Sequence, residues 1–374
     1  MAFKKRIDIL TPLALLVLAT QAFGSGQVAA TKKQDSQQAG AGPFRIPNRP
    51  SAPLFKGKQG KQKTEIHFDP ATRTVTLKLV VQDPNGYFIP NIRRENFVVY
   101  ENGVRQQDVA VDVEHAPASL ALVLEYGGRA QAINRVLGEE IARAGHQISD
   151  ALGRDDKISI WKYNDKIAKL ADFSQGREAL DTLFLNLGTP ELTETNLYDA
   201  VVFMVQQMRP VNGRKGIILI SSGIDTFSKA KYEDALNAAR DSDATIYSLG
   251  MVRVLRQLLE VHGTPGAMAK IDWARVAKEL EEIARASGGR AYSPENTIDL
   301  SPIYDDIMEN LKVRYVITYR SSNDADLNTP RTVRVELVDP KTGGPLQIVD
   351  ANGRTIPANV IVQESYVPSA AAGQ

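Results

Sequence analysis

Carboxylate, hydroxyl and guanidinium side chains stand directly after apolar runs of this 374-residue chain. The run Leu120–Leu124 leads into Glu-Tyr-Gly-Gly-Arg, and the run Ile217–Ile220 leads into Ser-Ser-Gly-Ile-Asp. A third polar segment, Leu192–Asn196, contains Thr195 and precedes the apolar helical pattern that starts at Leu197. Because ligands of open α/β sheets bind beyond the carboxyl ends of the strands, we expect these loops to form one binding edge. The candidate partner-binding residues are Glu125, Arg129, Thr195, Ser222 and Asp225.

The residue types that most enzymes need are missing or badly spaced. The chain has no cysteine, and no two of its four histidines have metal-ligand spacing. The first loop holds only Gly127-Gly128 rather than a dinucleotide-binding G-x-G-x-x-G, and no P-loop or G-x-S-x-G elbow occurs. Asp199 and Asp225 lack a neighbouring base or nucleophile, so we interpret them as structural. The sequence predicts no catalytic residue and no cofactor.

Strands alternate with helices over residues 116–312. The runs Leu120–Leu124, Ile217–Ile220 and Ala244–Leu249 are apolar enough for parallel strands buried on both faces. This alternation predicts a doubly wound, mostly parallel α/β sheet. Trp161 and Tyr163 are expected at an edge of that sheet. Helical spacing of apolar residues predicts helices near residues 133–152, 197–208, 232–239, 273–284 and 303–311.

Residues 64–115 and 313–367 read as strands without a helical period. Glu101-Asn102-Gly103 predicts a hairpin turn into the strand Val109–Val113. Neither segment is long enough to bury its apolar face and close a sheet alone. We therefore predict one smaller β domain, made of 64–115 plus 313–367, with the α/β domain of residues 116–312 inserted in it.

The amino terminus has the pattern of an exported protein. Lys4-Lys5-Arg6 precedes an apolar run over residues 9–23, which predicts a signal peptide over residues 1–30. Cleavage is expected after Gly24 or after Ala30. Residues 31–63 hold eight basic residues and one acidic residue, a net charge of +7, and predict a disordered linker. This linker could touch an anionic surface, but it lacks the interleaved aromatic residues of a nucleic-acid-binding segment.

Five segments resemble a von Willebrand factor A domain and occur in the order found in that family. They resemble the strand before the D-x-S-x-S loop, the threonine followed by L-Y-D-A, the strand ending in L-T-D-G-x-D-T, and the last two strands. Asn96–Gly103 resembles the leader of exported bacterial VWFA-related proteins, and with the C-terminal strands the similarity covers about residues 70–320. The five segments are Leu122–Leu124, Thr195–Ala200, Ile218–Thr226, Ser248–Gly250 and Gly288–Tyr292.

The resemblance implies a metal-ion-dependent adhesion site, in which oxygen ligands hold Mg²⁺ and an acidic group of a partner completes the shell. The first loop of that site falls on Glu125, Gly127 and Arg129, its threonine on Thr195, and its distal aspartate on Ser222. Only the threonine is kept. Mg²⁺ requires octahedral ligands at about 2.0–2.1 Å, so we predict no bound metal here.

Two interpretations of the altered site remain open at this point. In one, Glu125 and Arg129 form an ion pair in place of the metal, and Thr195 caps its helix. In the other, the same face binds a protein without metal, and Arg129 takes a carboxylate of the partner.

We expect an exported protein, periplasmic, secreted or on the cell surface, that acts as a non-enzymatic adhesion or protein-interaction module. The alternatives are a Mg²⁺-dependent adhesion module with a non-standard site and an envelope hydrolase. The amphipathic segment Val252–Lys270 is a second candidate for a partner contact, and the alternative is a helix packed on its own domain. The sequence sets neither the partner nor the oligomeric state.

Overall fold

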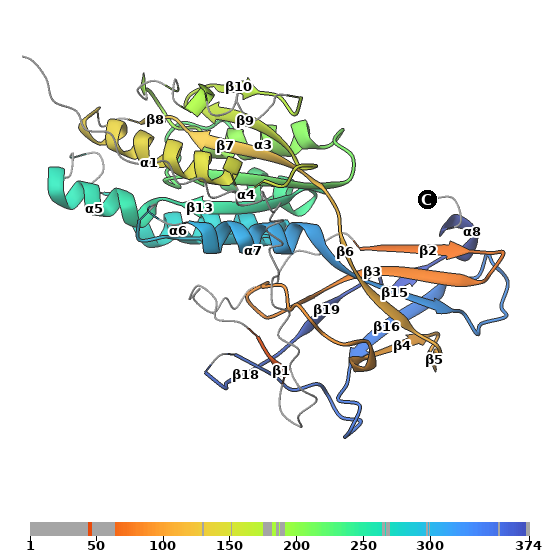
Figure 1. Ribbon diagram of the computed structural model, residues 1–374. Helices are drawn as coiled ribbons and strands as arrows, with labels where there is room; N and C mark the ends of the chain where they lie inside the picture. Colours follow the sequence, from red (N-terminus) through yellow and green to blue (C-terminus); the bar gives the residue numbers. More distant parts are fainter. Residues whose placement is uncertain are drawn as a thin grey trace, which may run out of the picture. The chain divides into compact units, whose positions relative to one another are not determined.

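The main sheet of the α/β part has six strands in the computed structural model (Figure 1). The structure describes residues 44–46, 64–128, 131–150, 152–174, 182–184, 187, 191–263, 266, 270–296, 298, 300–350 and 352–371. The strand order is β10-β9-β7-β12-β13-β14, and every neighbouring pair is parallel except β10 with β9. The doubly wound sheet is therefore confirmed. The strands are β7 Ala118–Glu125, β9 Lys157–Tyr163, β10 Ile167–Ala171, β12 Arg214–Ser221, β13 Thr245–Gly250 and β14 Arg290–Tyr292.

Helices cover both faces of this sheet because successive side chains of each strand point to opposite faces. On β7, Leu122 packs with one helix layer and Val123 with the other. The first layer is α1 Gln131–Asp150, α5 Val252–His262 and α7 Ser301–Lys312. The second layer is α3 Leu197–Met208, α4 Tyr232–Arg240 and α6 Trp273–Ala286.

Two interpretations from the sequence change here. Trp161 and Tyr163 do not lie at an edge, because β10 pairs outside β9, and both side chains are buried. Helix α5 packs on its own α/β part, with Leu255 and Leu259 buried in the core. The apolar face of α5 is therefore not a partner contact but packs on its own domain, which was the alternative interpretation of residues 252–270.

The strands on either side of the α/β part pair with one another. Strand β15 lies between β3 and β6 and pairs antiparallel with both, and β16 pairs antiparallel with β4. One sheet is β19 Asn359–Ile361, β3 Thr74–Gln82, β15 Val313–Arg320 and β6 Ala110–His115, with β2 Glu65–Asp69 on β3. Another is β20 Ser365–Tyr366, β16 Arg331–Leu337, β4 Phe97–Glu101 and β5 Val104–Arg105, and a third is β1 Phe44–Arg45, β17 Ile348–Val349 and β18 Thr355–Ile356. The short elements are the 3-10 turn Arg94–Asn96 and α8 Pro368–Ala371.

These pairings are what a discontinuous β domain requires, and the division into separate domains stays a prediction. The hairpin is only partly as expected. Asn102 and Gly103 turn the chain with positive φ, but they lead into the short strand β5. The strand that follows, β6, pairs with β15 instead of β4. The signal peptide and nearly all of the basic linker lie outside the described residues.

The two ends of the α/β part are joined where β6 meets β15. The Ala116 N–H donates to the Lys312 carbonyl oxygen at 3.1 Å. The buried Asp156 carboxylate accepts from the Ala118 N–H at 2.9 Å and from the Lys312 ammonium at 2.7 Å. A single carboxylate therefore binds both the first strand and the last helix of the α/β part.

A buried ion pair organises the β part. The side chains of Glu101 and Arg331 are 0% and 1% exposed, and their charged groups lie 3.2 Å apart. Glu101 also accepts from the hydroxyls of Ser321 at 2.7 Å, Tyr319 at 2.8 Å and Tyr366 at 3.2 Å. Burial in this network raises the pKa of Tyr319 and of Tyr366, with the Glu101 charge as the next cause. The pair connects β4, β15, β16 and β20.

A chain that ends after Leu311 loses β15, β16, β19 and β20. We expect such a chain to aggregate and to lose hydrogen-exchange protection over Val75–Val81, because β3 and β6 are then left with unpaired edges. Comparison of residues 64–311 with residues 64–374 by hydrogen exchange and gel filtration measures this. A monomer that keeps full protection over Val75–Val81 would contradict the dependence of β3 on β15.

Replacement of Arg331 by methionine should lower the free energy of unfolding by about 3–5 kcal/mol, because Glu101 is left as an uncompensated buried charge. Arg334→Met on the same strand is the control, since its side chain is 60% exposed, and should cost less than about 1 kcal/mol. Urea unfolding gives both values. Adding Glu101→Gln to Arg331→Met should recover part of the loss, and equal effects of the two single substitutions would rule out the buried charge as the cause.

Candidate functional site

The candidate site lies at the carboxyl ends of β7 and β12. These strands run parallel, with Leu124 opposite Ile220, so Glu125 and Ser221 end side by side. A short parallel pair, β8 Gly127–Gly128 with β11 Glu191–Leu192, brings the segment of Thr195 to the same edge.

Glu125 is the centre of this edge and is 3% exposed. Its Oε2 accepts from the Ser222 N–H at 2.6 Å and the Ser221 hydroxyl at 2.9 Å. The Ser222 hydroxyl donates to the same carboxylate, 2.7 Å from Oε1 and 3.0 Å from Oε2. The carboxylate therefore bridges the end of β7 to the loop after β12, and Ser222 is its main partner.

Burial raises the pKa of the Glu125 carboxyl, and hydrogen bonds from Ser222, Ser221 and Tyr163 lower it in part. A buried carboxyl with a raised pKa holds its proton more tightly than an exposed one.

Tyr163 belongs to this site, although the sequence analysis did not select it. Its hydroxyl lies 2.8 Å from Ser221 Oγ and 3.2 Å from Glu125 Oε2, and its single proton can serve one of them at a time. Burial raises the pKa of Tyr163 well above the ordinary value, with the Glu125 charge as the next cause. The available signal was its place near the end of the strand next to β7, which aligns it with Glu125.

Gly127 closes the position where the family has its first serine. A Cβ atom there would lie 2.6 Å from the Asn164 Cβ and 2.6 Å from the Thr193 Oγ1. Distances this short force the neighbours to move. The segment of Asn164 is itself fixed to the start of α3, because the Asn196 N–H donates to the Asn164 carbonyl oxygen at 2.9 Å. A serine hydroxyl therefore has no room in the present arrangement.

Thr195 is buried and is joined to the loop after β12 through its backbone. Its N–H donates to the Thr226 hydroxyl at 2.8 Å, and its carbonyl oxygen accepts from the Thr226 N–H at 2.8 Å. The expected helix cap is wrong, since α3 begins after Asn196, which makes no side-chain cap hydrogen bond. Thr195 instead joins the helix start to the neighbouring loop.

Asp225 and Asp199 both accept hydrogen bonds that hold the same loop. Asp225 Oδ1 accepts from the Ser228 hydroxyl at 2.5 Å and from the Tyr198 N–H at 3.2 Å, at the start of α3. Asp199 accepts from the N–H groups of Lys229 at 3.0 Å and Ala230 at 2.8 Å.

Arg129 lies outside the described residues, so its ion pair with Glu125 and its contact with a partner stay predictions. The structure brings the other four candidates, Glu125, Thr195, Ser222 and Asp225, to one edge of the sheet.

The donor set at this edge does not fit the family's metal. The Glu125 carboxylate is engaged by serine hydroxyl and backbone donors, and a hydroxyl stands where the distal aspartate would be. No cluster of three or more His, Asp or Glu side chains that could hold a metal occurs among the residues that the structure describes. We therefore derive no chemistry through a metal.

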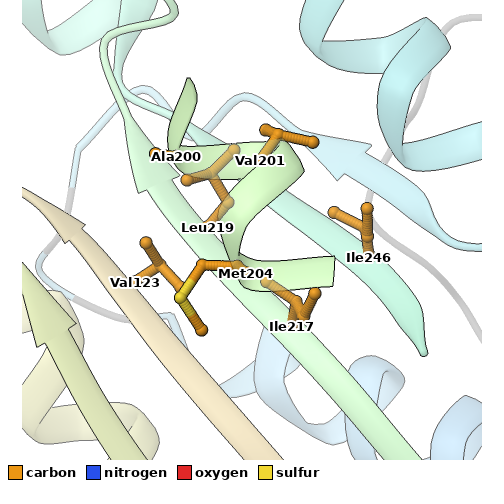
Figure 2. A pocket seen from close by; sticks show the side chains of 7 residues that line it. All are labelled: Val123, Ala200, Val201, Met204, Ile217, Leu219 and Ile246. Carbon is orange, nitrogen blue, oxygen red and sulfur yellow. The ribbon is translucent and has the colours of Figure 1, made fainter. Parts of the chain in front are cut away.

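An apolar cavity between α3 and the sheet offers no ligand site either. Figure 2 shows its lining, with side chains of α3 facing those of β7, β12 and β13. The cavity measures about 10 Å³, about the volume of one water-sized sphere, so it is a packing gap. Its lining residues are Val123, Ala200, Val201, Met204, Ile217, Leu219 and Ile246.

Several solved structures are similar to this chain. An aerotolerance-related membrane protein from Bacteroides fragilis, with multiple mutations to serines, is 12% identical over 52% of this chain and 99% of its own, with a TM-score of 0.38. The vWF domain of the type V pili tip protein Mfa5 from Porphyromonas gingivalis is 11% identical over 52% and 95%, with a TM-score of 0.37. A von Willebrand factor type A structure from Catenulispora acidiphila is 11% identical over 74% and 75%, with a TM-score of 0.38.

No family model and no curated protein matches the chain. With TM-scores below 0.5, these similarities say nothing about the function of this chain. The fold of the α/β part follows from its own strand order. The five segments that resemble the family fall on β7, the start of α3, β12 with its loop, β13 and β14, in that order. The order of these segments along the sheet is the one that the resemblance implies. Within the described residues, no helix is long and apolar enough to span a membrane.

The raised pKa of Glu125 gives a test of the site. The folded protein keeps this proton at pH values where the unfolded chain has lost it, so the carboxyl stabilises the fold at low pH. The free energy of unfolding should fall relative to Glu125→Gln as pH rises from the ordinary pKa of 4.5, by about 1.4 kcal/mol per pH unit until the folded pKa is passed.

Urea unfolding between about pH 4 and about pH 8 measures this difference. If the wild type instead gains stability relative to Glu125→Gln as the pH rises, the hydrogen bonds outweigh burial and the raised pKa is wrong.

Proposed function

We propose that this chain is an exported, non-enzymatic protein-interaction module of von Willebrand A type that acts without a bound metal. Its binding face is the edge formed by the loops after β7 and β12 and the start of α3. The hydrogen-bonded Glu125 carboxylate takes the structural place of the ion by joining these loops. The partner is another protein.

One observation carries the proposal: Ser222 donates both its N–H and its hydroxyl to the Glu125 carboxylate. In the related family, the equivalent positions are both acidic and need a cation between them. Here one acid and one hydroxyl satisfy each other, so the loops can be ordered with no ion present. The closed position at Gly127 supports the same conclusion.

Order at the edge without an ion has a functional meaning. A metal-dependent module binds through an acidic group of the partner that completes the coordination shell. A module without metal must bind through its own side chains, by shape, apolar contact and charge. The serine hydroxyls that contact Glu125 are buried, with Ser221 0% and Ser222 1% exposed, and this burial supports a binding role rather than a catalytic one.

Calorimetric titration of the full chain with Mg²⁺ and with Mn²⁺ tests the proposal. We expect no saturable binding in the micromolar range and no shift of the thermal midpoint at millimolar ion, because a ligand that binds only the folded state would raise that midpoint. Glu125→Gln is the test variant. Asp243→Asn is the control, because that carboxylate pairs with Lys215 away from the edge. Micromolar binding that is lost in Glu125→Gln and kept in Asp243→Asn would overturn the metal-free site.

A further inference from the structure

The loop after β12 exposes one aromatic side chain. Phe227 is 72% exposed, whereas its polar neighbours Asp225, Thr226 and Ser228 are only partly exposed. This reverses the usual order of a surface loop, in which polar side chains face water. An isolated exposed apolar residue is common on protein surfaces and does not by itself mark a binding site.

Hydrogen bonds hold the loop on both sides of Phe227. Before it, Thr226 is bound through its N–H and its hydroxyl to the backbone of Thr195. After it, the Ser228 hydroxyl is bound to Asp225, and the next two N–H groups are bound to Asp199. The polar side chains of the loop thus fix its backbone, while the aromatic ring is left outside.

A fixed loop with an exposed ring is well suited to binding. Ordering of a flexible loop costs free energy when a partner binds, and that cost is small when the loop is already held by its own hydrogen bonds. Large side chains that fill a pocket of the partner contribute most of the binding energy at protein interfaces. Phe227 can supply such an anchor at the edge described above.

Charge indicates which partner fits. Lys229 and Lys231 follow Phe227 at alternate positions and are exposed, and neither forms an ion pair with the residues that the structure describes. The next carboxylates in sequence are Glu233, which is exposed on α4, and Asp234, which accepts from the backbone N–H of Lys231 at 2.8 Å and so serves the start of α4. The chain's own basic segment, residues 31–63 with a charge of +7, would be repelled by these lysines.

We propose that Phe227 is the anchor of an interaction surface, completed by Lys229 and Lys231, for a protein with an apolar pocket bordered by carboxylates. The proposal rests on the proposed function and specifies its partner class. Phe227 fills the pocket, and the two ammonium groups meet the acidic border. Rim charges of this kind act mainly on the association rate and on salt dependence.

The test is photo-cross-linking from benzoylphenylalanine at position 227 of the full chain in its native cells, followed by measurement with the captured protein after purification. Position 261 is the matched control, because Val261 on α5 is 78% exposed and distant in sequence from the edge. We expect a partner other than this chain from position 227. Phe227→Ser should weaken its Kd by about tenfold or more, whereas Val261→Ser should leave it unchanged.

Lys229→Glu with Lys231→Glu should also weaken binding, and the wild-type affinity should fall with added salt. Equal thermal midpoints of the variants confirm that folding is unaffected. The anchor is overturned if no partner is captured from position 227, if the captured protein is a second copy, or if Phe227→Ser or the lysine reversal leaves the Kd unchanged. A partner captured from position 261 alone overturns both the anchor and the proposed binding face, and leaves only the protein-interaction role standing. Release of the captured partner by a metal chelator overturns the metal-free function itself.

Discussion

The antiparallel pair of β6 and β15 closes the α/β part at its two ends, and the arrangement of the binding edge depends on that closure. The hydrogen bond from Ala116 to Lys312 and the carboxylate of Asp156 fix where β7 begins and where α7 ends. From that start, the parallel register of β7 with β12 brings Glu125 beside Ser221. A shift of one residue in this register would turn Glu125 to the other face of the sheet. The position of the central carboxylate is thus set by backbone pairing at the opposite end of the strand.

At the edge itself, hydrogen bonds to carboxylates hold the loops together. One carboxylate makes each connection. Glu125 joins β7 to the loop after β12, and Asp225 joins that loop to α3. Asp199 joins α3 to Ala230, at the end of the same loop. Buried polar networks are favourable only when their members are satisfied. Most of the donors here are backbone N–H groups, which cannot move away, so the loops are ordered by fixed partners.

The α/β part could be predicted from the sequence because its signals are local. Continuous apolar runs marked the buried strands, and the helices followed from the spacing of apolar residues. The pairing of the β part could not be read in the same way. The turn at Asn102 and Gly103 was visible, but the partner of β6 lies some two hundred residues away in β15, and no local pattern identifies it.

The candidate site was predictable in its location and not in its bonding. The carboxyl ends of the strands indicated Glu125, Ser222 and Asp225, and the structure brings them to one edge. The partners of Glu125 depend on which strand lies beside β7, and the apparent edge residue Tyr163 is in fact buried there. The expected cap at Thr195 failed because its backbone is bound to Thr226, a contact between segments that sequence spacing does not encode.

Because of the crowding at Gly127, a metal centre could be built into this edge only by several simultaneous changes. A serine introduced alone would strike Asn164 and Thr193, and an aspartate introduced alone at position 222 would face Glu125 with no cation in reach. Each single step lowers stability before any step can gain an ion. The design of a divalent metal site on this scaffold must therefore first replace the side chains at positions 164 and 193, which contact Gly127, and only then add metal ligands.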